Sequence, residues 1–318
     1  MSEALLETKE LSKTFNIGKG KSLKAVSDVS LTLNKGETLA IVGESGCGKS
    51  TLARLLLRLE QATSGGIEFD GNDISEISGA VEKQWRRNVQ MVFQDPYTSL
   101  NPRMIAHDAI REPLDNYAEG TKQERNQKAH DLLHRVGLNV DFGQRYPHEL
   151  SGGQCQRLGI ARALALNPKV LVADEPVSAL DVSIQAQVLN LMMDLQADLG
   201  ISIVFVSHDL SVVRHISDRV IVMYLGRIVE EGPADIVLDT PSHPYTKALL
   251  DSVPIDHPSK RRSKTLLSGE VASPLNPPSG CAFRTRCPVA TDQCAQTIPK
   301  LRSVGPKVSA ACILLESK

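Results

Sequence analysis

The sequence predicts an α/β fold in which a mixed sheet core carries antiparallel β and helical subdomains and a small cysteine-rich C-terminal extension. Three observations predict it. A glycine-rich phosphate loop at residues 43–50 separates an apolar run from an amphipathic segment. A second apolar run, residues 170–175, ends in two carboxylates. Beyond Gly232 the composition shifts to proline, serine and basic residues, and the last part of the chain is rich in cysteine.

Length and charge limit the possible functions. A chain of 318 residues buries a sizeable core and exceeds the usual size of one domain. Its 36 basic and 37 acidic residues nearly cancel, so no global field favours nucleic acid. No apolar stretch reaches the roughly 18 to 20 residues that cross a bilayer, and residues 1–9 lack the apolar core of a signal peptide. We therefore expect any membrane role to depend on partners.

The first elements lead into the phosphate loop. Residues 5–15 and 26–33 read as antiparallel strands, 38–42 as a short buried strand and 50–59 as an amphipathic helix. A strand before the loop and a helix after it are the context that confirms the pattern G-x-x-x-x-G-K-[ST]. The alternative, a glycine-rich turn that only resembles a phosphate loop, lacks this context.

Backbone N–H groups and the helix dipole at such a loop attract anions. We predict that Lys49 neutralises the β- and γ-phosphates of a nucleotide and that Ser50 binds Mg²⁺. The predicted nucleotide contacts of the loop are Gly43, Glu44, Ser45, Gly46, Cys47, Gly48, Lys49, Ser50 and Thr51. Because Cys47 lies at a helix N-terminus, its thiol is expected to have a lowered pKa and to react with alkylating agents.

A helical stretch follows, from about residue 95 to residue 166. Apolar side chains recur at helical spacing within it, for example at Ala129, Leu132 and Val136. Near its end stands the glycine-rich run Leu150-Ser151-Gly152-Gly153-Gln154. Its serine and glycines would begin a helix and present N–H donors to a phosphate. Ser-Gly-Gly alone is more often a simple helix start, so its weight comes from its position just before the acidic strand.

The apolar run that ends at Asp174 and Glu175 supplies the second half of the predicted nucleotide site. Asp174 is expected to reach the metal through water, and Glu175 to orient the water that attacks the γ-phosphate. Ordinary charges at a strand end are the alternative reading. Further strands are expected at 203–206, 219–223 and 227–231, the last two as a hairpin around Leu225 and Gly226.

With these motifs in one order, the chain resembles the ATP-binding cassette (ABC) family, whose signature motif is similar to Leu150–Gln154. In that family the signature of one cassette faces the phosphate loop of another, so the resemblance implies two cassettes around two ATP molecules. It further implies that Gln94 contacts Mg²⁺ and links hydrolysis to the membrane partner, that Asp181 lies in the loop crossing between cassettes, and that His208 senses the γ-phosphate. Phe15 stands where the family stacks an aromatic ring on adenine. The residues assigned to the partner's ATP are Ser151, Gly152, Gly153 and Gln154.

Alone, Phe15 is equally compatible with a core side chain and His208 with a helix-entry residue. Cys155 departs from the polar or basic residue that this family leads us to expect after Gln154. The departure concerns the helix contacts beyond the phosphate donors.

The end of the chain narrows the resemblance. His243-Pro244-Tyr245-Thr246 and the stretch from Ser273 to Phe283 resemble the C-terminal extension of the ATPase subunits of bacterial dipeptide and oligopeptide importers. This implies a nucleotide-binding domain over residues 1–255 and an extension over 256–318. It also implies a sister ATPase in a heterodimer, with a homodimer still open, two membrane permease subunits and a separate substrate-binding protein. The expected location is the cytoplasmic face of the inner membrane, as a peripheral protein.

Four cysteines in the extension are spaced C-x5-C-x6-C-x17-C: Cys281, Cys287, Cys294 and Cys312. A cytosolic chain argues against two disulfides, and the lack of a tight C-x2-C pair weakens a zinc site. The spacing leaves a [4Fe-4S] cluster, zinc and unliganded thiols open. Similarity to the peptide importers, some of which carry such a cluster, favours the [4Fe-4S] cluster.

The sequence therefore predicts an ATP-hydrolysing subunit that energises import of dipeptides or short oligopeptides, with MgATP as the energy source. The alternative is a soluble ABC ATPase of DNA repair or translation. Against repair, only about a hundred residues separate Lys49 from Ser151, with no long heptad insertion. Against translation, the motifs occur once. A phosphate-loop kinase would leave residues 151–154 unexplained.

Overall fold

The computed structural model describes residues 3–18, 20–252 and 272–315. The predicted domain boundary at 255/256 lies outside these residues. The described residues form two compact units, one from the residues up to 75 together with those from 207 onward, and one from residues 76–206. The C-terminal cysteines thus belong to the same unit as the phosphate loop.

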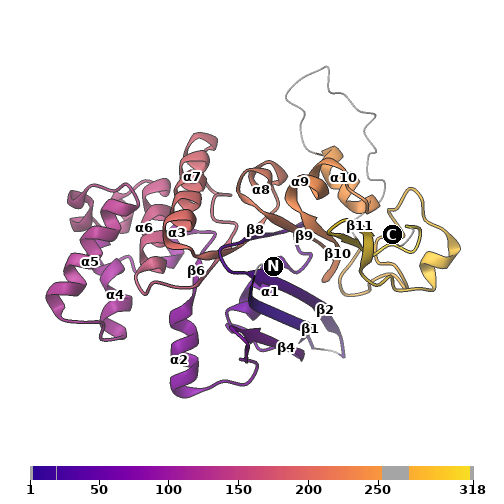
Figure 1. Cartoon of the computed structure of the whole chain (residues 1–318), viewed down its shortest axis with the longest axis horizontal. Helices are drawn as coiled ribbons and strands as arrows, with labels where there is room; N and C mark the ends of the chain where they lie inside the picture. Colours follow the sequence, from indigo (N-terminus) through magenta and orange to yellow (C-terminus); the bar gives the residue numbers. More distant parts are fainter. Residues whose placement is uncertain (1–2, 19, 253–271, 316–318) are drawn as a thin grey trace. The chain divides into compact units, whose positions relative to one another are not determined.

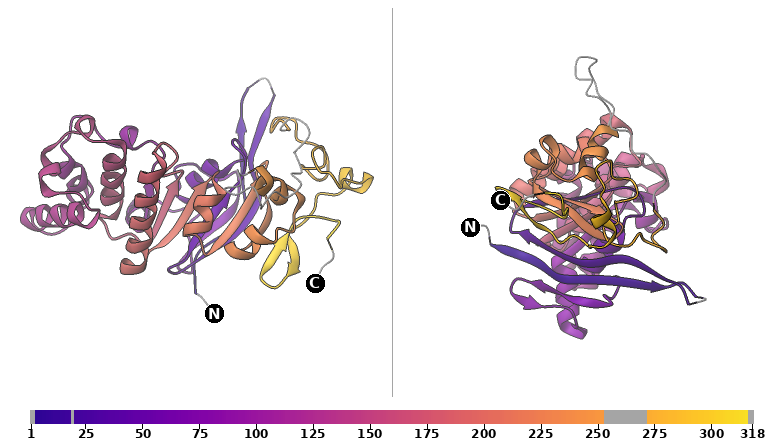
Figure 2. Two further views of the ribbon diagram at one scale, coloured as in Figure 1. Left: turned by 90° about the horizontal axis from the view of Figure 1, so that it is seen from above. Right: turned by 90° about the vertical axis from the view of Figure 1, so that its right-hand side faces the viewer.

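The first unit begins with an antiparallel sheet. Strands β1 (Ala4–Asn16) and β2 (Ser22–Asn34) form a long hairpin, joined by β4 (Ser64–Phe69) and β5 (Asn72–Asp73) in the order β2-β1-β4-β5. Figure 2 shows this hairpin as the two long indigo strands. In β2 the alternate side chains Val29, Leu31 and Leu33 are buried, which is the period-two pattern of a half-buried strand.

A second sheet in this unit is mixed, with the order β11-β12-β10-β9-β3. Strand β3 (Thr38–Val42) runs parallel to β9 (Arg219–Tyr224), and β9 forms the predicted hairpin with β10 (Arg227–Pro233). The five residues of β3 are buried, as both faces of a covered parallel strand require. The helices of the unit are α1 (Lys49–Leu56), α8 (Leu210–Ile216), α9 (Ala234–Asp239) and α10 (Pro244–Ser252).

The C-terminal segment, residues 272–315, extends this mixed sheet. After a 3-10 turn (Asp292–Ala295), β11 (Arg302–Gly305) pairs with β12 (Val308–Ala310), and β12 pairs with β10 through Glu230–Ala310 and Glu231–Ser309. Figure 1 shows this yellow segment beside β10. Phe283, Val308 and Ala310 are buried, so the segment adds side chains to the core of the first unit.

The second unit combines a parallel sheet with helices. Its strands are β6 (Val89–Val92), β7 (Val170–Asp174) and β8 (Ser202–Ser207), in the order β8-β7-β6. Helices α4, α5 and α6 pack on one another, as Figure 1 shows. The helices of the unit are α2 (Gly79–Asn88), α3 (Pro96–Ser99), α4 (Ala106–Asn116), α5 (Lys122–Arg135), α6 (Gly152–Leu164) and α7 (Val182–Leu199), with 3-10 turns at Val140–Gln144 and Pro147–Glu149.

Candidate active site

The phosphate loop joins β3 to α1, and two of its glycines have no possible substitute. Gly43 has a φ of 154°, and a Cβ built there would collide with the Met223 carbonyl oxygen. Gly48, the N-cap of α1, has a φ of 107°, and its Cβ would collide with the carbonyl oxygen of Ala25. Only glycine fits where a left-handed backbone passes this close to neighbouring strands. The loop is thus seated against β2 and β9.

Lys49 opens α1 with an almost fully buried side chain, 5% exposed. Its ammonium group donates to the carbonyl oxygens of Gly43 (2.8 Å) and Glu44 (3.1 Å). Ser50 and Thr51 follow in the first turn of α1. A buried cation at a helix N-terminus suits a polyphosphate, because the ammonium and the helix dipole both attract negative charge.

The surroundings of Cys47 contradict the expected lowering of its thiol pKa. Its side chain is 4% exposed, and burial raises the pKa of the thiol above its ordinary value, more than the nearby Lys49 charge lowers it. The helix N-terminus was expected to lower this pKa. Desolvation of a thiolate opposes the dipole and outweighs it here. Cys47 is therefore a packing residue of the loop.

In the second unit the structure brings Gln94 and Glu175 together, although 81 positions separate them in the sequence. Gln94 Nε2 donates to Glu175 Oε2 (3.0 Å) and lies 3.4 Å from the Ser178 hydroxyl. Asp174 ends β7 and is 6% exposed, whereas Glu175 is half-buried. The pair of carboxylates thus closes a wholly buried strand, as the sequence predicts.

Glu175 has an unusual backbone. Its φ is 48°, in the left-handed region that costs a non-glycine residue about 1 kcal/mol or more. Its N–H donates to the Val206 carbonyl oxygen (2.9 Å), and its own carbonyl oxygen accepts from the Ser178 hydroxyl (3.0 Å). These bonds hold a strained conformation that turns the chain sharply out of β7. Strained backbone conformations of this kind cluster at active sites, where they hold a side chain in one direction.

The run at residues 151–154 begins α6 through a capping box. The Ser151 hydroxyl faces the Gln154 N–H at 3.4 Å, while the Gln154 amide oxygen accepts from the Ser151 N–H at 2.9 Å. A Cβ on Gly153 would lie 2.5 Å from Ile184 Cγ2, so this glycine allows close packing against α7. Asp181, exposed, is the N-cap residue of α7. The helix start therefore faces solvent through Ser151 and the protein through its glycines.

Cys155 and Tyr97 tie neighbouring segments to this helix start. The Cys155 thiol donates to the Pro147 carbonyl oxygen (3.3 Å), and burial raises its pKa to about 11. The Tyr97 hydroxyl donates to the carbonyl oxygen of Leu150 (3.1 Å). The unexpected cysteine thus fills a buried position, where a charged residue would be costly.

The remaining predicted site residues lie as follows. Phe15, near the end of β1, pairs with Leu23, and the Lys13 ammonium lies 4.8 Å from the centre of its ring. His208 is exposed directly after β8, just before Asp209 caps α8. Phe15, Lys49 and His208 belong to the first unit, while Gln94, Ser151 and Glu175 belong to the second.

Sequence reasoning missed two residues that contact the phosphate loop. Both guanidinium Nη atoms of Arg286 donate to the Glu44 carboxylate, at 2.7 and 2.9 Å. The Tyr245 hydroxyl accepts from the Glu44 N–H at 2.9 Å. No local pattern signals contacts that span 242 and 201 positions, respectively.

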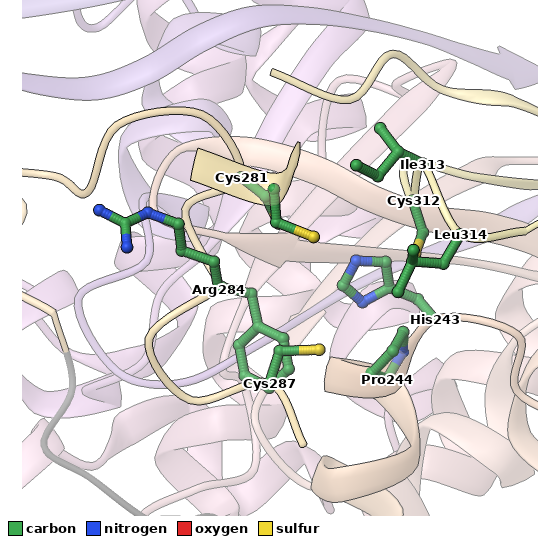
Figure 3. A pocket seen from close by; sticks show the side chains of 10 residues that line it. His243, Pro244, Cys281, Arg284, Cys287, Cys312, Ile313 and Leu314 are labelled. Carbon is green, nitrogen blue, oxygen red and sulfur yellow. The ribbon is translucent and has the colours of Figure 1, made fainter. Parts of the chain in front are cut away.

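The four tail cysteines line one pocket together with apolar side chains. Figure 3 shows the sulfur atoms of Cys281 and Cys287 pointing toward the side of His243. The pocket is lined by His243, Pro244, Cys281, Phe283, Arg284, Cys287, Cys294, Cys312, Ile313 and Leu314.

The prediction of an iron-sulfur cluster is nevertheless wrong. Across residues 3–18, 20–252 and 272–315, no three His, Cys, Asp or Glu side chains form a group that could hold a metal ion. Burial raises the pKa of both Cys281 and Cys287 above the ordinary value of a thiol. Zinc, the alternative at these cysteines, likewise finds no ligand group among the described residues.

Among the described residues, no helix has both the length and the apolar character that crossing a bilayer demands.

Comparison with known proteins identifies the family. The ABC transporter model matches residues 26–178, and the model of the oligopeptide/dipeptide transporter C-terminal region matches residues 229–294. The chain is 53% identical to the oligopeptide transport ATP-binding protein AppF of Bacillus subtilis (strain 168), over 98% of each chain. It is 50% identical to the di/tripeptide transport ATP-binding protein DppF of Pseudomonas aeruginosa (strain UCBPP-PA14), over 94% of each chain.

A solved structure agrees. The ATP-binding cassette MJ0796, as a dimer in a post-hydrolysis state bound to ADP and Pi, superposes with a TM-score of 0.66 at 31% identity and covers 72% of this chain and 99% of its own. The predicted phosphate-loop cassette with a mixed sheet and helices is confirmed. The chain belongs to the ABC transporter family, and within that family it resembles the ATP-binding proteins of oligopeptide and dipeptide transport.

Proposed function

We propose that this chain is the ATP-hydrolysing subunit of an ABC transporter that imports dipeptides or short oligopeptides. The observation that carries the proposal is identity of about half along nearly the whole length of AppF, named for oligopeptide transport, and DppF, named for di/tripeptide transport. The match to the oligopeptide/dipeptide C-terminal region supports the same cargo class. A soluble ATPase of DNA repair or translation finds no support among these relatives.

ATP binding is assigned to the phosphate loop, with Lys49 neutralising phosphate charge and Phe15 stacking on the base. Mg²⁺ would spread the charge of the terminal phosphates when bound. Ser50 offers a hydroxyl oxygen, Asp174 a carboxylate, and Gln94 an amide oxygen, because its amide nitrogen is already used toward Glu175. Oxygen donors of this kind are those that Mg²⁺ takes in proteins.

Hydrolysis is assigned to Glu175 and His208. Glu175 accepts a hydrogen bond from the attacking water and aims it at the γ-phosphorus, while His208 donates to the γ-phosphate oxygens. The hydrogen bond from Gln94 and the strained backbone support this role, since both fix the direction of the Glu175 side chain. Positioning of this kind is the main contribution a protein makes to phosphoryl transfer.

Coupling to the membrane subunits is assigned to the segment around Gln94. Two large apolar side chains flank it in an exposed state, Phe93 at 42% and Tyr97 at 46%. Through Gln94 the segment touches Glu175, and through Tyr97 it touches Leu150, next to the signature serine. Movement of a docked permease helix would therefore reach both the catalytic carboxylate and the partner-facing helix start. Exposed aromatic side chains of this kind are enriched at interfaces.

The proposed assembly contains a sister ATPase, as a heterodimer, two permease subunits and a separate substrate-binding protein, at the cytoplasmic face of the inner membrane. In it Ser151, Gly152, Gly153 and Gln154 contact the ATP held by the sister cassette, and Asp181 lies in the loop between cassettes. Residues 1–255 form the nucleotide-binding domain, with a helical subdomain over about 95–166, and residues 256–318 form the extension. The dimeric state of the MJ0796 cassette supports pairing.

The test is reconstitution. The chain is co-expressed with its sister ATPase and permeases and placed in vesicles with the binding protein. ATP hydrolysis and uptake of a labelled tripeptide should both occur, and both should fail in Lys49→Ala. Uptake of another solute with no response to peptides would overturn the cargo, and ATP hydrolysis without any membrane partner bound would favour a soluble ATPase.

A further inference from the structure

A partly buried ion pair links the C-terminal segment to the phosphate loop. Arg286 is 7% exposed, and its two Nη atoms bind both carboxylate oxygens of Glu44 in parallel. Glu44 is the first residue after Gly43 and stands inside the phosphate-binding motif. A bidentate guanidinium–carboxylate pair fixes orientation as well as charge.

A cluster of packed aromatic side chains holds the segment around Arg286 in position. Phe283 is 1% exposed, and its ring centre lies 5.4 Å from that of Tyr224 and 5.3 Å from that of Tyr245. The hydroxyl of Tyr245, which is also buried, accepts a hydrogen bond from the backbone N–H of Glu44. The backbone N–H of Arg286 donates to the Phe283 carbonyl oxygen (3.0 Å). One aromatic cluster therefore positions both groups that contact Glu44. Packed rings of this kind leave side chains few alternative rotamers.

The ion pair compensates the negative charge of Glu44 within the phosphate loop. A carboxylate without a compensating charge would repel a polyphosphate bound beside it. In partly buried surroundings this repulsion is weakly screened. The interaction with Glu44 raises the pKa of Arg286 further above its already high value, so the compensating charge is permanent. Lys49 is separately engaged with the loop carbonyls.

We propose that Arg286 is a positioning residue of the nucleotide site, which neutralises Glu44 and so sets the affinity of the phosphate loop for ATP. The C-terminal segment then acts on nucleotide binding through a defined contact. This inference rests on the proposed function only in that the ligand of the loop is ATP.

The test compares the full-length chain and its variants for their Kd for a fluorescent ATP analogue with Mg²⁺. Arg286→Met should raise the Kd on the order of tenfold, from like-charge repulsion at an intermediate dielectric. The matched control is Arg284→Met, because Arg284 donates to the Ser279 carbonyl oxygen (2.9 Å) and does not contact the loop. Its Kd should stay within about twofold of the unaltered chain.

The double variant Arg286→Met/Glu44→Gln separates charge compensation from a simple fastening of the tail. Removing both charges should bring the Kd back to within about threefold of the unaltered chain. Glu44→Gln alone, which leaves the arginine facing the phosphates, should bind the analogue more tightly than the unaltered chain. This arm does not depend on the folding of Arg286→Met.

Three results would overturn the inference: an unchanged Kd in Arg286→Met, a double variant as weak as the single, or weakened binding in Glu44→Gln. The assembled transporter adds a further readout, since Arg286→Met should raise KM for ATP and leave kcat little changed. If the unaltered chain binds no ATP and Lys49→Ala matches it, the proposed function fails, and this inference fails with it.

Discussion

Glu175 shows how single residues carry the proposed chemistry. Its left-handed backbone and its hydrogen bond from Gln94 together fix the direction of the carboxylate. We expect Glu175→Gln to keep ATP binding and to slow hydrolysis by about 10² to 10⁴-fold, because the amide preserves shape and loses the ability to activate water. The measurement is ATP turnover in the assembled transporter beside nucleotide affinity. Near-normal turnover would remove Glu175 from this role.

Cys47 leads to a second prediction at the residue scale. Because burial raises its pKa, little thiolate is present near neutral pH. Labelling by iodoacetamide at pH 7.5 should be at least about tenfold slower than that of a free thiol such as glutathione, with or without MgATP. Mass spectrometry of the peptide containing residue 47 gives the rate. Fast labelling that MgATP suppresses would restore the reactive thiol that the sequence suggests.

Among the elements, α6 is the sharpest test of the paired-cassette arrangement. Ser151 is exposed at its N-cap, and its capping box with Gln154 satisfies two backbone groups. Ser151→Arg should abolish transport-coupled hydrolysis, because a long side chain covers the N–H donors offered to the sister cassette. ATP affinity at the chain's own phosphate loop should remain. Loss of ATP binding in the isolated chain would show that the run at 151–154 serves its own nucleotide.

Ser151→Ala is the matched control for that prediction. It removes the cap, at a cost of about 1 kcal/mol in stability, and leaves the donors uncovered. Its melting temperature should fall slightly, and coupled hydrolysis should fall much less than in Ser151→Arg, because only the hydroxyl contact is lost. If the two variants lose hydrolysis equally, the defect comes from the helix start itself rather than from a blocked interface.

The elements differ in how far their sequence could reveal them. Strand β7 and the hairpin of β9 and β10 follow local rules, since apolar runs and the turn at Leu225–Gly226 are short-range signals, and the sequence predicts both. The pairing of β12 with β10 is different. It joins residues some eighty positions apart, and three residues of strand have no periodicity long enough to read.

The candidate site divides in the same way. Motif spacing indicates the loop, the signature and the acidic strand end, because these chemistries need fixed residue types in a fixed local order. The Arg286–Glu44 pair is beyond such reasoning, since it depends on tertiary packing around Phe283. The cysteine spacing misled for a related reason. Spacing constrains which ligands are possible and does not determine whether the side chains converge.

At the scale of the whole molecule, the attachment of the C-terminal segment should govern how stability depends on pH. Glu230 in β10 is fully buried and accepts from the N–H groups of Ser242 and His243. His243, 2% exposed, accepts from the Tyr245 N–H and hydrogen-bonds to the backbone of Ala311. These contacts link α10, β10 and the end of the chain. Burial lowers the pKa of His243 from 6.5 to about 4 and raises the pKa of Glu230.

The two groups have opposite signs. For His243 the unfolded chain binds the proton more tightly, so its contribution to stability is present above pH 6.5 and is lost as the pH falls toward 4. For Glu230 the folded chain binds the proton more tightly, so a fall in pH stabilises the fold. A pH profile of the unaltered protein therefore mixes the two, and a variant is needed to isolate the histidine.

His243→Asn is that variant, because its amide oxygen is placed to accept from the Tyr245 N–H as the ring Nδ1 does. Between pH 7 and pH 5 the unaltered chain should lose about 2 kcal/mol more unfolding free energy than the variant, the amount that a pKa of about 4 against 6.5 implies. Urea unfolding followed by circular dichroism at both pH values measures the difference. The variant should be less stable than the unaltered chain at pH 7, and this difference in unfolding free energy should shrink or reverse at pH 5. Parallel losses in the two proteins would show that His243 is protonated as easily in the fold as outside it, and that the C-terminal attachment is not closed to water.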